Sequence, residues 1–104
     1  MKVTILQRDI EWCDSAINLQ RASEAIDRWP GADLYVLPEM FSTGFCTVPN
    51  GVAEGEQGVT LQWMLRKAAE VDAAIAGSVA VKVGENYYNR FYFVKPDGSV
   101  AQYD

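Results

Sequence analysis

The chain has 104 residues, of which 49% are hydrophobic and 22% charged, a length and composition suited to one small globular domain. Its 9 lysines and arginines against 14 aspartates and glutamates give a net charge of -5, which disfavours a nucleic-acid partner because phosphate binding needs clustered basic side chains. No apolar run approaches the roughly 20 residues that cross a bilayer, and the N-terminus has no signal-peptide pattern, so we expect a cytoplasmic protein without membrane association.

The absence of histidine limits the chemistry that these residues can perform. It excludes Ser-His-Asp and Cys-His catalysis and histidine-based metal sites within the chain. The two cysteines, Cys13 and Cys46, have neither zinc-binding nor redox spacing, and nothing supports a disulfide between them. The residues therefore indicate no metal site and no redox motif. Acid–base work falls to Asp, Glu, Lys, Tyr or Cys.

The first third of the chain predicts a strand–helix–strand unit. Residues Lys2–Gln7 form a short β-branched run that is typical of a strand. Asp14 and Ser15 are candidate N-caps for a helix, which the Pro30–Gly31 pair ends. The apolar side of that helix is predicted from steps of three and four residues: Leu19, Ala22, Ile26 and Trp29. A second strand over Ala32–Pro38 then pairs in parallel with the first, as such units do.

A loop and a second helix follow. The stretch 41–58 is rich in glycine and is predicted to be a loop. It lacks the Gly-Lys-Ser/Thr ending of a phosphate-binding loop. Thr60 is the expected cap of the second helix. The expected buried side of this helix is Leu61, Leu65, Ala68 and Val71.

The last third of the chain predicts strands joined by turns. Residues Ala73–Val81 show no polar alternation, which indicates a strand buried on both faces. A turn leads to a strand over Tyr87–Lys95, and Pro96–Ser99 has the residues of a tight turn before a strand that begins at Val100. Strands that alternate first with helices and then with hairpins indicate an α/β protein with a mixed sheet.

One carboxylate stands where such a protein binds its ligands. Glu39 follows the second strand directly, after Pro38, and ligands of parallel sheets bind beyond the carboxyl ends of the strands. Met40, Phe41 and Phe45 offer an apolar wall that would desolvate the Glu39 carboxylate and raise its pKa, as a general base requires. The alternative is a surface carboxylate that caps a helix or pairs with an arginine.

Other residues have weaker claims to a site. The tryptophans Trp12, Trp29 and Trp63 more often fill cores or interfaces than bind ligands. Asn89 and Arg90 lie in the middle of an aromatic strand. Either Asn89 is a buried hydrogen-bonding side chain or it helps to orient a site residue.

Several segments together resemble the N-terminal part of the nitrilase superfamily, the carbon-nitrogen hydrolases. The resemblance covers essentially all 104 residues, in the order and spacing of the family. The wording of "LPEMFSTGF", "GSVA" and "NRF" is most similar to the omega-amidase branch. The segments that carry the resemblance are "VTILQ", "WCDSAINLQRA", "GADLYVLPEMFSTGF", "LQWM", "AAIAGSVAV" and "YYNRFYFVKPDGSVAQYD".

The resemblance implies a four-layer αββα sandwich that usually forms a homo-oligomer. It also implies hydrolysis of a small-molecule amide, an omega-amide of a dicarboxylic acid, with release of ammonia through a Glu-Lys-Cys triad and without a cofactor. Glu39 matches the family's general base. The substrate pocket would be lined by Phe41, Thr43 and Phe45.

The lysine and cysteine of the triad come later in the family than Asp104, the last residue here, and neither Cys13 nor Cys46 matches the nucleophile. We therefore expect residues 1–104 to be the N-terminal part of a single hydrolase domain and to be inactive alone. The alternative is a non-catalytic half-domain that acts as an interaction module. An unrelated small α/β binding domain would require Glu39 to be incidental.

Overall fold

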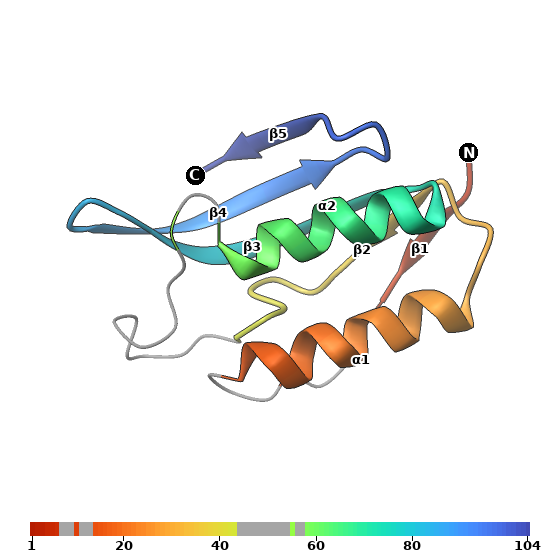
Figure 1. The fold of residues 1–104 in the computed structure, drawn as a ribbon, viewed down its shortest axis with the longest axis horizontal. Helices are drawn as coiled ribbons and strands as arrows, with labels where there is room; N and C mark the ends of the chain where they lie inside the picture. The colour runs from red at the N-terminus through yellow and green to blue at the C-terminus, as the bar shows by residue number, and fades with distance from the viewer. Residues whose placement is uncertain (7–9, 11–13, 44–54, 56–57) are drawn as a thin grey trace.

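The computed structural model describes residues 1–6, 10, 14–43, 55 and 58–104. In this part the chain forms one five-stranded sheet and two helices (Figure 1). The elements in chain order are β1 (Val3–Ile5), α1 (Ser15–Arg28), β2 (Leu34–Val36), α2 (Val59–Val71), β3 (Ala74–Val83), β4 (Asn86–Val94) and β5 (Val100–Tyr103).

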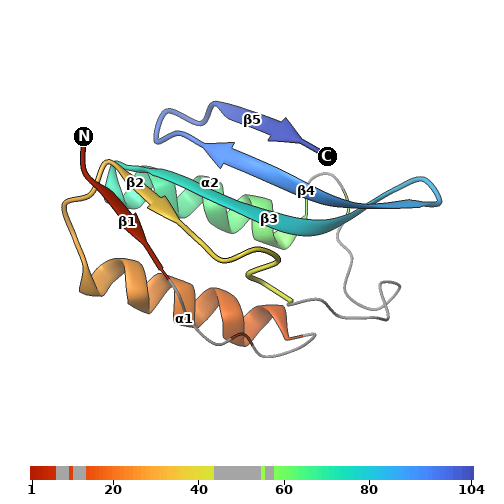
Figure 2. The same ribbon diagram turned by 180° about the vertical axis from the view of Figure 1, so that it is seen from behind.

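The sheet is mixed, as the sequence predicts. Its strands follow the order β1-β2-β3-β4-β5, with β1, β2 and β3 parallel to one another and with β4 and β5 added antiparallel. The two helices connect the parallel strands. Both helices lie on the same face of the sheet, in front of it in Figure 1 and behind it in Figure 2. The described chain therefore has one helix layer and one sheet layer.

Helix α1 begins as predicted. The Asp14 carboxylate caps it, with Oδ1 accepting a hydrogen bond of 3.2 Å from the Ile17 N–H. The chain leaves the helix after Arg28 through Gly31, whose φ of +96° favours glycine. The predicted apolar side is correct except at its end, because Trp29 is 59% exposed. The helix has already ended there, so helical spacing no longer directs the indole inward.

Helix α2 begins two residues earlier than expected. Gly58 is its N-cap and makes no side-chain hydrogen bond, so the prediction of Thr60 as the cap is wrong. Thr60 lies inside the first turn and is fully buried. The helix ends at Asp72 in a left-handed conformation. Leu65 and Val71 are only partly buried, and the buried side chains are Thr60, Leu61, Trp63, Met64, Lys67 and Ala68.

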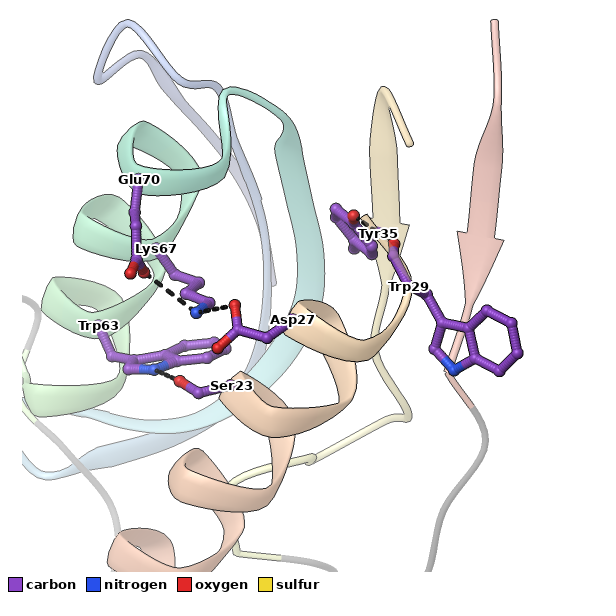
Figure 3. Close-up of polar contacts among 7 residues, drawn as sticks. All are labelled: Ser23, Asp27, Trp29, Tyr35, Trp63, Lys67 and Glu70. Carbon is purple, nitrogen blue, oxygen red and sulfur yellow. Dashed lines mark hydrogen bonds and ion pairs between the residues drawn. The ribbon is translucent and has the colours of Figure 1, made fainter. Parts of the chain in front are cut away.

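Polar contacts join the two helices (Figure 3). The Trp63 indole N–H donates to Ser23 Oγ at 2.8 Å. Lys67, only 5% exposed, places its ammonium 2.7 Å from Asp27 Oδ1 and 3.0 Å from Glu70 Oε2. Burial alone would lower the pKa of Lys67, but the hydrogen bonds to the two carboxylates outweigh it and the pKa is raised. Lys67 therefore stays charged between the helices.

The core lies between the helices and the sheet. Strand β2 is shorter than predicted, although the Leu37 N–H still donates to the Ala76 carbonyl at 2.8 Å and so prolongs the ladder by one bond. Strand β3 is buried over Ala74–Val79, which confirms the prediction for a strand without polar alternation. The largest fully buried side chains are Tyr35, Tyr92, Ile26, Met64, Ile75, Val79, Val81 and Val94.

The face of the sheet away from the helices, which we call the open face, is covered by no described helix (Figure 2). Side chains alternate between the two faces of a strand, and the strand register places Val3 and Ile5 on the open face with Phe91 and Tyr103. These four side chains are between 41% and 78% exposed. The open face is therefore partly apolar.

Neither of the helices that the structure describes has both the length and the apolar character of a membrane-spanning segment.

Candidate active site

Glu39 lies at the predicted place. The chain leaves the sheet after β2 and Leu37, and Glu39 is exposed in the turn that follows. Among the described residues, no ion pair or side-chain hydrogen bond involves Glu39, so the alternative of a carboxylate paired with an arginine finds no partner there. The carboxylate thus stands at the carboxyl end of a parallel strand, where α/β proteins bind their ligands.

The turn that carries Glu39 is held by hydrogen bonds on both sides. Met40 has a φ of +53°, a left-handed conformation that is uncommon for a residue other than glycine. Its N–H donates to Ser78 Oγ at 2.9 Å, and its carbonyl accepts from the Thr43 N–H at 3.2 Å. On the α1 side, the Asn18 amide donates to the Ser42 carbonyl at 2.8 Å. Strand β3 and helix α1 therefore fix the turn together.

Phe41 anchors the same turn in the core. Its ring is 3% exposed and lies 5.8 Å from the Trp63 ring, centroid to centroid. A Cβ atom on Gly77 would come within 2.9 Å of two Phe41 ring carbons, so the ring fits only because residue 77 has no side chain. The expectation that Phe41 forms an apolar wall beside Glu39 is therefore wrong: the ring points into the core.

A cleft of about 370 Å³ opens beside Glu39. Its walls come from the end of β2, the middle of β3 and β4, and the end of β5, so its apolar part comes from strands distant in the sequence. The residues that line it are Leu37, Glu39, Gly77, Ser78, Asn89, Phe91, Tyr103 and Asp104. The register sets Ser78 opposite Phe91 and Phe91 opposite Tyr103, so these three form a row across three strands.

The other predicted pocket residues are placed differently. Thr43 is buried and is not among the residues that line the cleft, and nor is Phe41. Phe45 lies outside the described residues, as do Cys13 and Cys46. The substrate-binding role of Phe41, Thr43 and Phe45 stays a prediction.

Asn89 and Arg90 point to opposite faces of β4. Asn89 is exposed and lines the cleft with Glu39, so the idea of a buried asparagine is wrong. Arg90 is 6% exposed and forms a bidentate pair with the Asp104 carboxylate. Its Nε donates to Oδ1, and its Nη2 donates to Oδ2 at 2.9 Å. Its hydrogen bond with Asp104 raises the pKa of Arg90, and the same bond lowers the pKa of Asp104. This pair joins β4 to the end of β5 beside the cleft.

A second cavity, of about 320 Å³, lies between α1 and β1 at the edge of the sheet. Its charged residues are Arg21, Glu24 and Arg28, and it contains none of the predicted site residues. No group of side chains suited to a metal ion occurs among the residues that the structure describes.

The sheet and its two crossover helices define an α/β protein, with a candidate site beside the carboxylate beyond β2. Within that class, the family model for carbon-nitrogen hydrolase matches residues 2–104, so the chain belongs to the carbon-nitrogen hydrolase family. This confirms the family predicted from the sequence.

The similar curated proteins are amidases. The chain is 38% identical over 104 residues to the omega-amidase YafV of Escherichia coli and 36% identical over 106 residues to that of Yersinia enterocolitica. It is 33% identical over 107 residues to the 2-oxoglutaramate amidase of Bacillus subtilis. The chain spans about 40% of the length of these relatives.

Solved structures agree with the fold. XC1258 of Xanthomonas campestris, a CN-hydrolase superfamily protein with an arsenic adduct in its active site, matches the whole chain with a TM-score of 0.91 and 32% identity. The chain covers 40% of that structure. Nit3 of Saccharomyces cerevisiae, a nitrilase superfamily member, matches 99% of the chain with a TM-score of 0.79, and at 22% identity this likeness concerns the fold alone.

Proposed function

We propose that this chain is the N-terminal part of an amidase that hydrolyses an omega-amide of a dicarboxylic acid and releases ammonia. The observation that supports this most is the position of Glu39 in a cleft at the carboxyl end of β2. All 104 residues of the chain align with an omega-amidase at 38% identity. The substrate class comes from the resemblance to that branch of the family.

In the proposed reaction Glu39 is the general base. It takes the proton from a cysteine thiol, and the thiolate attacks the amide carbonyl carbon. A lysine ammonium stabilises the oxyanion that forms. The carbon–nitrogen bond then breaks and ammonia leaves with the transferred proton. Water next attacks the thioester, which gives the carboxylate product and restores the thiol.

The proposal assigns the lysine and the cysteine to residues beyond Asp104, because Cys13 and Cys46 do not match the family's nucleophile. Residues 1–104 then contribute the base and one wall of the cleft within a single domain. The partly apolar open face would pack against the remainder of that domain, which the family's four-layer sandwich implies.

The test is ammonia release from omega-amides by the full-length protein, by its Glu39→Gln variant and by the isolated 104-residue chain. Glutamine keeps the size of the side chain but cannot accept the thiol proton, so we expect kcat/KM to fall by about 10²–10⁴. We expect no ammonia release from the 104-residue chain.

The matched control is Glu85→Gln, the same change at an exposed position in the turn between β3 and β4. It is expected to leave kcat/KM unchanged. Undiminished turnover by Glu39→Gln would contradict the assigned base. Turnover by the pure 104-residue chain would contradict the assignment of lysine and cysteine to later residues. A full-length protein that hydrolyses no omega-amide would contradict the proposed substrate class.

A further inference from the structure

Two neighbouring residues of β3 hold the turn after β2 from opposite faces of the sheet. Gly77 leaves room for the Phe41 ring on the helix face, where an added Cβ would lie 2.9 Å from it. Ser78, on the open face, accepts the Met40 N–H at 2.9 Å. Glu39 precedes both anchored residues. Gly77 and Ser78 therefore hold the two residues that directly follow Glu39.

The Met40 N–H needs such a partner. Met40 follows the last ladder bond of β2, which ends at Leu37, so no strand neighbour is in register to accept its N–H. The residue is half-buried, and backbone donors in such places are rarely left without an acceptor. Its left-handed φ of +53° is a conformation that only surrounding contacts maintain in a residue with a side chain.

The Ser78 hydroxyl is well placed to impose this geometry. It is 8% exposed, it lines the same cleft as Glu39, and the strand register places it in one row with Phe91 and Tyr103. An oxygen on a strand is a more exact anchor than one on a loop. Ser78 is held in the sheet by the pairing of β3 with β4, in which it lies opposite Phe91.

We infer that Ser78 is a positioning residue for the catalytic carboxylate. By accepting the Met40 N–H it fixes the left-handed backbone next to Glu39 and so directs that side chain into the cleft. The inference rests on the proposed function, in which Glu39 is the general base. It makes the Gly-Ser pair of β3, rather than the loop alone, responsible for the alignment of the base.

The experiment compares Ser78→Ala with Ser23→Ala in the full-length protein. Both changes remove one hydroxyl that accepts a hydrogen bond, but Ser23 binds the Trp63 indole between the helices, away from the cleft. For Ser78→Ala we expect kcat to fall by about 10- to 100-fold with little change in KM, since misplacing a catalytic group has effects of this size. Ser78→Thr keeps the oxygen and suits a strand, and it should restore kcat to within about 3-fold of wild type.

Hydrogen exchange of the Met40 amide gives a readout besides activity. We expect faster exchange in Ser78→Ala and an unchanged rate in Ser23→Ala. A kcat of Ser78→Ala no lower than that of Ser23→Ala would overturn the inference, even with faster exchange at Met40.

The two proposals can fail separately. If Glu39→Gln abolishes turnover and Ser78→Ala does not lower it, only the positioning role fails. If the wild type hydrolyses no omega-amide, the proposed function fails, and the Met40 exchange rates then decide the anchoring: equal rates in Ser78→Ala and wild type overturn it, and a faster rate supports it.

Discussion

Gly77 offers the sharpest test of how the turn after β2 is packed. In Gly77→Ala the new Cβ would lie 2.9 Å from Phe41 Cδ1 and Cε1 and 3.3 Å from Leu37 Cβ. Contacts below 3.0 Å force one group to move. The Phe41 ring is 3% exposed and lies against Trp63, so it cannot turn out into solvent.

The expected magnitude follows from two opposing effects. Overpacking a filled core costs about 1–3 kcal/mol. Replacing glycine by alanine also restricts the unfolded chain, and this stabilises the protein by about 0.4–1 kcal/mol, which offsets part of the packing cost. We therefore expect the free energy of unfolding to fall by about 1–2 kcal/mol. Urea unfolding of variant and wild type measures the difference directly.

Gly55→Ala is the matched control, because an added Cβ there meets nothing within 4 Å. Its free energy of unfolding should stay within about 0.5 kcal/mol of wild type. The free energy of unfolding of the double variant Gly77→Ala/Phe41→Leu should fall by less than the sum of the decreases in the two single variants. Leucine leaves free part of the space that the new methyl group needs. A Gly77→Ala protein as stable as Gly55→Ala would refute the reasoning.

Two further predictions concern ion pairs. The pKa of Lys67 is raised above 10.5. Its pairing with Asp27 and Glu70 therefore contributes fully to folding stability below pH 10.5, and this contribution is lost as the pH rises through the folded-state pKa. Urea unfolding should therefore show a stability difference between wild type and Lys67→Met of about 1 kcal/mol or less near neutral pH, since both carboxylates are mostly exposed, and the difference should shrink above pH 10.5. A difference that grows in alkali would contradict the assigned pairs. The hydrogen bond from Arg90 lowers the pKa of Asp104 from 3.8. This pair therefore stabilises the folded state above pH 3.8, and the stabilisation is lost as the pH falls through the folded-state pKa. The stability difference between wild type and Asp104→Asn, measured by urea unfolding, should accordingly disappear in acid, and a constant difference would exclude the pair as its cause.

Much of the fold could be predicted because its elements depend on local chemistry. The cap at Asp14 and the turn at Gly98, whose φ is +93°, follow from the chemistry of single residues. The errors occur at element ends. Trp29 continues the helical spacing but lies past the last helical residue, and Thr60 has a capping side chain but the helix had already begun. At such places the surrounding contacts, rather than propensity, decide where an element stops.

The candidate site divides in the same way. Glu39 could be found because a lone acid after a buried parallel strand is a local pattern. Ser78, Phe91 and Tyr103 could not, because their meeting in one row depends on the register of three strands. Alternation along β4 would have placed Asn89 and Arg90 on opposite faces, but it does not say which face carries the cleft.

The mixed character of the sheet has a consequence for the order in which the protein folds. Strands β3, β4 and β5 pair through tight turns, so they can assemble from residues close in sequence. The Glu39 turn depends instead on contacts 24 and 38 residues apart, those between Asn18 and Ser42 and between Met40 and Ser78. Closing such loops costs entropy before any contact forms. We therefore expect the hairpins to form first, and the turn that carries Glu39 to reach its place only when both crossover helices have packed on the sheet.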